Sequence, residues 1–345
     1  MPGTIFRLLA VMAVGLLLAG TVSADVVQNL YSARVPVVDQ SSQTIAAAAS
    51  DALGQVVVKV SGSEEALEHP TVRKAMGNAR SQVQQYAFQD GDTGLVARFQ
   101  FETSYVQRLV KQAGLPLWTA NRPRVIAWLV TEQGGERQFV NMDTTPELAR
   151  ELMDEFDARG VPAQLPLYDL TDATAVSTDD VWALNGDALQ AASQRYDVDD
   201  VLFGRVVAMS TGEWLGDWSY LYGRHRLDRH ASAPESLGFS RQGVALAAES
   251  MAQRYAVVTS GADDARVVMN VTGINEFGAY AELVNWLEGL ELVDHANVRR
   301  IAGDRVELTL VSMADADDLA KLIELNEHLV PQAVVPGQLD YLWQK

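Results

Sequence analysis

Few side chains in this 345-residue sequence have the type and spacing that metal binding requires. Cysteine is absent, and the histidines are His69, His225, His230, His295 and His328. No histidine belongs to an H-E-x-x-H motif. The closest pair, His225 and His230, is separated by a spacing that does not place two side chains on one helix face. We therefore predict neither a metal site nor a bound cofactor.

Motifs for nucleophilic and phosphate chemistry are absent as well. The sequence contains no G-x-S-x-G elbow, no S-x-x-K, no Walker loop and no G-x-G-x-x-G. Paired carboxylates could still act as acid and base, because the chain has 45 acidic residues. The adjacent pairs Asp179-Asp180, Asp199-Asp200 and Asp263-Asp264 are predicted to be solvated turn residues.

A cluster of basic residues is unusual in a chain whose formal net charge is −18. It lies within "GRHRLDRH" and consists of Arg224, His225, Arg226, Arg229 and His230. One hypothesis is a contact for an anionic partner: a phosphate, a glycan carboxylate or an acidic protein surface. The alternative is a solvated loop tip that binds nothing.

Just before this cluster, "EWLGDWSYLY" places two tryptophans on one face of a predicted strand. Trp214 and Trp218 share that face with Gly216, so the two rings would flank a notch. If exposed, the notch would be a stacking platform for a sugar or a cation. If buried, it would be ordinary core packing. On the preceding predicted strand, Gly204 is expected to admit a neighbouring ring, and Arg205 points to the opposite face.

The first 24 residues are predicted to form a cleaved signal peptide. Arg7 precedes an apolar run from Leu8 to Ala19, and Val22-Ser23-Ala24 fits the small-x-small cleavage rule, which makes Asp25 the predicted mature start. The apolar run is about a dozen residues long, whereas a membrane-spanning helix needs ~20. A retained anchor is the alternative. We expect an exported, periplasmic protein without a later transmembrane span, and its acidity argues against nucleic-acid partners.

Three segments of helices and strands are predicted to follow, over residues 25–118, 119–260 and 261–345. In the first, the apolar face from Ile45 to Val60 indicates a helix. The second alternates strands and helices, which predicts βαβ units and a partly parallel sheet. Its acidic stretch from Asp169 to Asp180 is expected to be a loop. The third has the order β-α-β-β-α-β, which is ferredoxin-like. The fold class is therefore α+β or α/β, built from several small mixed-sheet domains.

Several stretches, taken in this order, resemble an exported proteobacterial family filed as domain of unknown function 2066. They are "YSARVPVVDQS" from Tyr31, "VVKVSGS" from Val57, "QAGLPLWTANRPRVIAWL" from Gln112, "VWAL" from Val181 and "YDVDDVLFGRV" from Tyr196. The resemblance spans most of the predicted mature chain and implies an exported bacterial envelope protein. It brings no activity, cofactor or catalytic residue.

The sequence favours a non-enzymatic periplasmic binding or adaptor protein, because motifs for a nucleophile, a metal or a cofactor are missing. The expected partner is an envelope protein or a glycan. Two alternatives stay open: an envelope hydrolase with a carboxylate site, and a binder of an anionic glycan or small anion at the basic cluster. The most informative structural feature would be a pocket that gathers polar residues from two segments.

Overall fold

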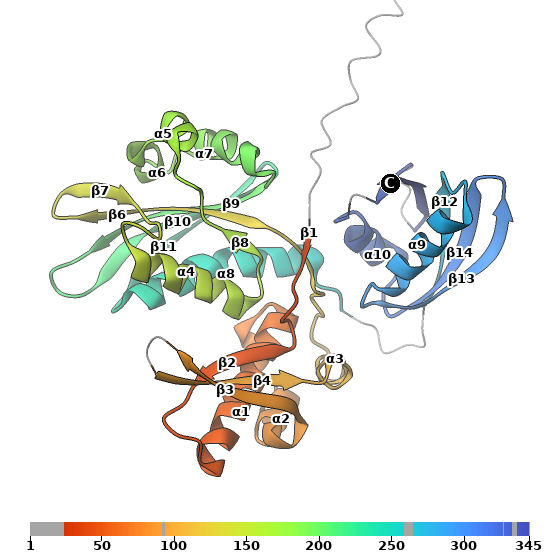
Figure 1. Ribbon diagram of the computed structural model, residues 1–345, viewed down its shortest axis with the longest axis horizontal. Coiled ribbons are helices and arrows are strands. Elements are labelled where there is room, and N and C mark those ends of the chain that lie inside the picture. The colour runs from red at the N-terminus through yellow and green to blue at the C-terminus, as the bar shows by residue number, and fades with distance from the viewer. Residues whose placement is uncertain (1–23, 92–93, 259–264, 327, 333–336, 345) are drawn as a thin grey trace, which may run out of the picture.

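The computed structural model describes residues 24–91, 94–258, 265–326, 328–332 and 337–344 (Figure 1). The predicted signal peptide, apart from Ala24, and the pair Asp263-Asp264 lie outside these residues. Within them, helices and strands are mixed in several small sheets, which confirms the predicted α+β class. No helix in this part of the chain is long and apolar enough to cross a membrane.

The first segment is a three-stranded antiparallel sheet with helices packed against it. The strand order is β2-β4-β3. The predicted helix is confirmed as α1, which begins after Ser41, whose side chain accepts a hydrogen bond from the Thr44 N–H. The elements of this segment and of the small β1-β5 sheet are β1 (Ala24–Val26), β2 (Ser32–Pro36), α1 (Ser42–Ser61), α2 (Pro70–Met76), β3 (Val83–Gly91), β4 (Gly94–Phe101), α3 (Thr103–Gln112) and β5 (Asn121–Pro123).

The second segment is a mixed six-stranded sheet covered by helices on both faces (Figure 1). Its strands are β6 (Val125–Gln133), β7 (Glu136–Phe139), β8 (Ala163–Gln164), β9 (Asp200–Ala208), β10 (Trp214–Tyr222) and β11 (His225–Ala233). The order is β11-β10-β9-β6-β7, with β8 beside β6. Because β6 runs parallel to both β8 and β9, the predicted partly parallel sheet is confirmed.

Two hydrophobic cores lie on the two faces of this sheet. On one face are α4 (Pro146–Arg159) and α8 (Ser236–Tyr255), and on the other are α5 (Leu170–Ala175), α6 (Thr178–Trp182) and α7 (Gly186–Ser193). Strand β6 serves both cores, since Ala127 packs into one and Trp128 into the other. A strand that is apolar on both faces is typical of a covered sheet.

The stretch from Asp169 to Asp180 was expected to be a loop, and that prediction is wrong. It forms α5 and the beginning of α6, because its acidic residues begin helices. The Asp169 carboxylate accepts hydrogen bonds from the N–H groups of Thr171 and Asp172. Ser177 and Asp180 cap α6 reciprocally, each side chain accepting from the backbone N–H of the other.

The third segment has the predicted β-α-β-β-α-β order, with one more strand. Its elements are β12 (Ala265–Thr272), α9 (Phe277–Glu288), β13 (Val293–Ala302), β14 (Arg305–Ser312), α10 (Ala316–Ile323), β15 (Leu329–Pro331) and β16 (Leu339–Trp343). The sheet order is β13-β14-β12-β16-β15. The short strand β15 reverses the chain before β16, so β16 inserts beside β12 and runs parallel to it.

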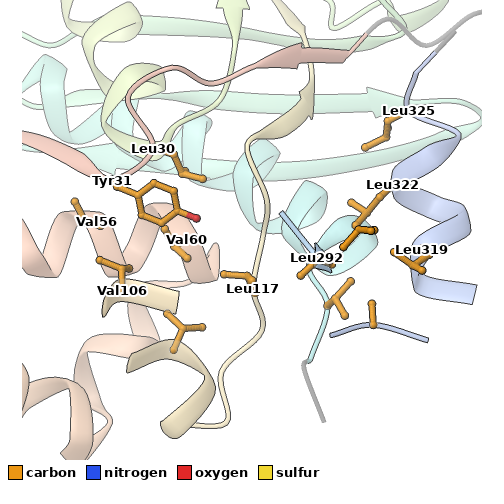
Figure 2. Close-up of a cluster of buried hydrophobic side chains, with 14 of the residues drawn as sticks. Leu30, Tyr31, Val56, Val60, Val106, Leu117, Leu292, Leu319, Leu322 and Leu325 are labelled. Atoms are coloured by element: carbon orange, nitrogen blue, oxygen red, sulfur yellow. The ribbon is translucent and has the colours of Figure 1, made fainter. Parts of the chain in front are cut away.

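The first and third segments share one cluster of buried side chains. Figure 2 shows Leu117 between residues of the first segment, such as Val60, and residues of the third, such as Leu292. Polar contacts support the same junction. The part-buried Glu291 carboxylate accepts hydrogen bonds from the Tyr31 hydroxyl and the Ala120 N–H, both at 3.2 Å. The fold therefore brings together parts of the chain that are far apart in sequence.

Candidate functional site

The predicted tryptophan notch is closed, because Trp218 is fully buried between β9 and α8. Its ring packs against two glycines: a Cβ at Gly204 would lie 2.5 Å from Trp218 Cε3, and a Cβ at Gly243 would lie 2.3 Å from Cε2. The indole N–H donates to the Phe239 carbonyl oxygen at 3.1 Å. The expectation that Gly204 admits a ring is confirmed, and the tryptophan face at Trp218 is core packing.

The other two members of the notch, Trp214 and Gly216, precede Trp218 on the same strand. Trp214 is part-buried at the start of β10. A Cβ at Gly216 would approach the Arg205 carbonyl oxygen to 1.9 Å, so this glycine serves close strand packing rather than a ligand. Arg205 is about one-third exposed, and its guanidinium is paired with Asp217 at 2.8 Å. No open notch remains between the two rings.

The basic cluster lies on the edge strand β11 and in the hairpin turn that precedes it. The strand sends its arginines to opposite faces of the sheet. Arg226 donates to the Asp228 carboxylate and the Leu184 carbonyl oxygen, whereas Arg229 donates to Glu249 and to the Gln242 carbonyl oxygen of α8.

The remaining members of the cluster also lie apart. His230 contacts the Asp217 carboxylate at 3.0 Å, and His225 stacks on Tyr222 with ring centroids 5.0 Å apart. Arg224 lies in the exposed turn before β11. The structure thus distributes the five residues and neutralises both arginines of the strand. Anion binding at this surface stays a prediction.

Burial raises the pKa of three carboxyl groups among the described residues, namely Glu155, Asp200 and Glu291. Asp200 was predicted to be solvated, and this is wrong: it begins β9 and is buried. Its carboxylate accepts from the Tyr220 hydroxyl at 2.7 Å and from Arg254 at 3.1 Å. The three groups are separate, and none of them lines either of the two cavities described below. They provide no paired acid and base.

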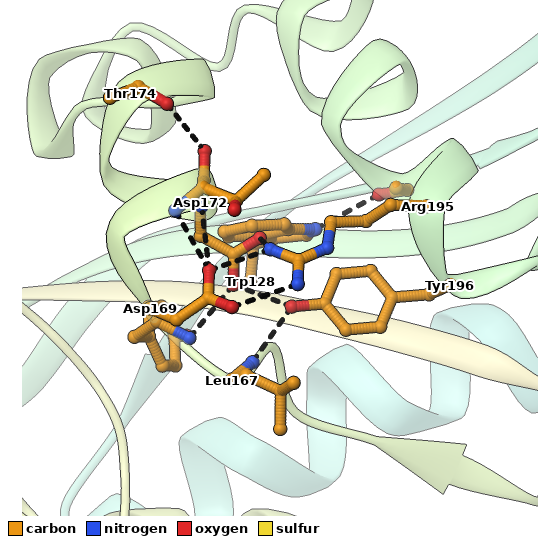
Figure 3. Close-up of polar contacts among 10 residues, drawn as sticks. Trp128, Leu167, Asp169, Asp172, Thr174, Arg195 and Tyr196 are labelled. Atoms are coloured by element: carbon orange, nitrogen blue, oxygen red, sulfur yellow. Dashed lines mark hydrogen bonds and ion pairs between the residues drawn. The ribbon is translucent and has the colours of Figure 1, made fainter.

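A second polar network, shown in Figure 3, fastens α5 to the chain before β9. Arg195 contacts Asp169 at 2.7 Å and Asp172 at 2.8 Å. The buried Asp172 carboxylate also accepts from the Tyr168 N–H at 2.8 Å and from the Tyr196 hydroxyl. Every charge in this network has an opposite charge beside it, so the network explains the local structure.

A polar pocket between the first and second segments differs from these networks. Its volume is about 110 Å³, and it is lined by Asn29, Ser32, Ala33, Arg34, Lys59, Gln89, Arg98 and Asp157. All of these residues except Ala33 are polar or charged. Seven of the eight come from the turn before β2, from β2, α1, β3 and β4, and Asp157 comes from α4 of the second segment. This is the feature that the sequence analysis identified as most informative.

The charges in the polar pocket do not balance. Lys59, Arg34 and Arg98 are cationic, whereas Asp157 is the single carboxylate among the lining residues. Asp157 is already paired with Arg34 at 2.6 Å. When Lys59 is protonated, the lining therefore carries an excess of positive charge inside a strongly acidic protein.

Lys59 is the least solvated of these cations. The residue is 3% exposed, and its ammonium donates to the Ser32 carbonyl oxygen at 3.2 Å, which is its one hydrogen bond within the described chain. An ammonium has three donors, so two are left without a protein acceptor. Burial, and to a smaller extent the charges of the neighbouring arginines, lower the pKa of Lys59 to about 8, while Asp157 acts in the opposite direction.

Arg122 fixes the position of Lys59. This arginine lies in β5, is fully buried, and donates hydrogen bonds to five carbonyl oxygens, those of Lys59, Trp118, Thr119, Arg159 and Gly160, at 2.8 to 3.2 Å. Lys59 and Arg159 belong to the last turns of α1 and α4. Carbonyl groups at helix C-termini are unsatisfied and carry partial negative charge. One guanidinium therefore joins two helix ends, and the pocket forms beside this junction.

A larger groove adjoins the polar pocket. Its volume is about 370 Å³, and its lining residues are Val26, Val27, Gln28, Asn29, Asp157, Gly160, Val161 and Pro162. Asn29 and Asp157 line both cavities. The groove and the pocket therefore share a boundary, and a ligand could occupy both.

No residue of the polar pocket was predicted to be a site residue. One signal was present: Lys59 is the only charge in the apolar run "QVVVKVSG" at the end of a predicted helix. A lone lysine in a run that is otherwise buried must either reach solvent or enter a polar site. The contributions of Arg98 and Asp157 depend on tertiary packing and had no such signal. Among the described residues, no group of three or more histidine, aspartate or glutamate side chains could hold a metal ion.

One part of the chain is similar to a family of unknown function. A model for a domain of unknown function (DUF8605) matches residues 24–119. This range contains every lining residue of the polar pocket except Asp157. No curated protein matches the chain. The expected similarity to an uncharacterised family is thus confirmed for these residues. The matching model is not that of family 2066, so the resemblance to family 2066 stays a prediction.

Replacing Gly243 by alanine should destabilise the protein by about 2 to 3 kcal/mol, because the new methyl group would overlap the Trp218 ring in a closely packed core. Gly278→Ala is the matched control, since this helical glycine has open space around its Cβ position. The control should change stability by less than about 1 kcal/mol, in the stabilising direction. Urea unfolding followed by tryptophan fluorescence compares the two. Equal midpoints would contradict the assigned packing of Trp218.

Lys59→Met should stabilise the protein at pH 7 by about 2 kcal/mol, because it removes a buried charge that has one hydrogen bond. The difference should depend on pH. Above pH 8 the unfolded chain, with the ordinary lysine pKa of 10.5, binds more protons than the folded chain. The wild type should therefore gain stability relative to Lys59→Met as the pH rises from about 8 to about 10.5.

The measurement is the free energy of unfolding as a function of pH for the wild type, Lys59→Met and Lys74→Met. Lys74 is an exposed lysine on α2, so its replacement should leave the pH dependence of the wild type unchanged. A constant difference between the wild type and Lys59→Met across this range would show that Lys59 is solvated.

Proposed function

We propose that this protein binds an anionic ligand without catalysing a reaction, and that the polar pocket is the binding site. The observation that carries the proposal is Lys59, a buried ammonium beside Arg34 and Arg98 with two donors that have no acceptor among the described residues. A bound anion would accept those hydrogen bonds and supply the missing negative charge. Charge-assisted hydrogen bonds of this kind are stronger than neutral ones.

Comparison with the other polar networks supports the polar pocket as the binding site. Asp172 and Asp200 are each buried beside an arginine, and both accept additional hydrogen bonds. Lys59 forms no ion pair with a described residue, and burial makes its charge unfavourable. An unfavourable charge in a cavity is a common property of functional sites. A hydrolase would need paired carboxylates at a cavity, whereas Asp157 is the single carboxylate among the residues that line the polar pocket.

Titration of the wild type with acetate and with inorganic phosphate tests this proposal. Both anions should raise the melting temperature in a saturable manner, because they bind only the folded protein. Lys59→Met should weaken binding at least tenfold, whereas Lys74→Met should bind as the wild type does. Affinity should be highest below pH 8 and fall as the ammonium loses its proton. Equal affinity of Lys59→Met and the wild type would exclude the polar pocket.

We also propose that the protein is exported to the periplasm of the bacterial envelope. The support is the leader sequence, in which an apolar run follows Arg7 and ends before Val22-Ser23-Ala24. The resemblance to family 2066 agrees with this location. N-terminal sequencing of the protein from a periplasmic fraction should begin at Asp25. Recovery of a chain that begins at Met1 would contradict cleavage.

A further inference from the structure

We infer that the anion bound in the polar pocket is the C-terminal carboxylate of an extended polypeptide, whose preceding residues lie in the adjoining groove. This inference rests on the proposed anion site and adds the chemistry of the ligand. Three features carry it: the shared boundary of the two cavities, the free edge of β1, and the size and polarity of the pocket.

The first feature is the continuity of the two cavities. The groove follows the chain from Val26 to Asn29, and the polar pocket begins at Asn29. On the opposite side, Asp157 of α4 lines both cavities. A chain that runs along the groove in the same direction as β1 therefore arrives with its end at the pocket.

The second feature is the edge of β1 that faces away from β5, which no other strand of the described residues covers. This strand pairs with β5 on one side, in a sheet that has two strands. Val27 donates to the Ala120 carbonyl oxygen at 2.9 Å. Because main-chain groups alternate in direction along an antiparallel strand, Val26 turns its N–H and C=O away from β5.

Val26 also lines the groove and is 61% exposed. An unpaired strand edge accepts an added strand through main-chain hydrogen bonds. A polypeptide has N–H and C=O groups at the spacing that this edge requires, whereas a glycan has no such series. The free edge therefore favours a peptide over a carboxylated sugar.

The third feature distinguishes the end of a chain from an acidic side chain within it. The pocket holds about 110 Å³, and all of its lining residues except Ala33 are polar. This lining offers hydrogen-bond partners to a carboxylate and little apolar surface to the side chains of a chain that continues. The cations Lys59, Arg34 and Arg98 complement one negative group at that position. Capture of a terminal carboxylate is a known mode of peptide recognition.

Fluorescence anisotropy with short labelled peptides of alanine and valine tests the inference. The peptide with a free C-terminal carboxylate should bind in a saturable manner and more tightly than acetate. Amidation of its C-terminus should weaken binding at least tenfold. Lys59→Met should remove the preference for the free carboxylate, because that preference arises from the cationic pocket.

Substitutions at Val26 separate the groove from the pocket. Val26→Pro removes the N–H on the free edge of β1 and should weaken peptide binding at least fivefold while leaving acetate binding unchanged. Unchanged acetate binding also shows that the variant is folded. Val26→Ala keeps the N–H and is the matched control, which should retain peptide binding within about twofold of the wild type, since it removes only exposed side-chain atoms.

The outcomes distinguish this inference from the proposed function. If acetate binds but free and amidated peptides bind alike, the peptide inference is overturned and the anion site stands. If glucuronate binds more tightly than the free-carboxylate peptides, the ligand is a glycan and the inference is also overturned. If acetate, phosphate and peptide all fail to bind, the proposed anion site itself is overturned.

Discussion

The guanidinium of Arg122 is the interaction on which the arrangement of the first two segments depends. It is fully buried and satisfies five carbonyl oxygens, including those at the ends of α1 and α4. Buried carbonyls without donors would each cost about 1 to 3 kcal/mol. Two helix C-termini can meet inside the protein only because a cation lies between them. Its position in β5 also places this junction beside β1, and so beside the groove.

The polar pocket follows from the same constraint. Since Arg122 holds the Lys59 carbonyl, the end of α1 cannot turn to bring the lysine side chain into solvent. The ammonium instead points to β2, where Ser32 offers one carbonyl oxygen. Elsewhere in the structure, buried charges such as Asp172 and Asp200 are matched by arginines. The buried aspartates therefore stabilise the fold through their arginine partners, whereas we assign the Lys59 ammonium to ligand binding.

Sequence patterns predicted much of the fold, because those elements are specified by local rules. The apolar face of α1 and the alternation of strands and helices in the second segment are each recognisable from spacing alone. The acidic residues around Asp169 were misinterpreted because the same side chains that favour solvent also begin helices, and only the following turn decides between them. Asp200 was misinterpreted because its partners, Tyr220 and Arg254, lie far along the chain.

The sequence by itself determined the α+β class, the absence of cysteine chemistry and the acidic character of the chain. It also indicated two candidate surfaces, the tryptophan notch and the basic cluster. Only the tertiary structure decided that Trp218 is enclosed by Gly204 and Gly243, and that the arginines of β11 face opposite sides of the sheet. It also brought Asp157 and Lys59 to one pocket. The physical reason is that strand pairing and helix packing set these distances, and they join residues whose separation in sequence carries no local signal.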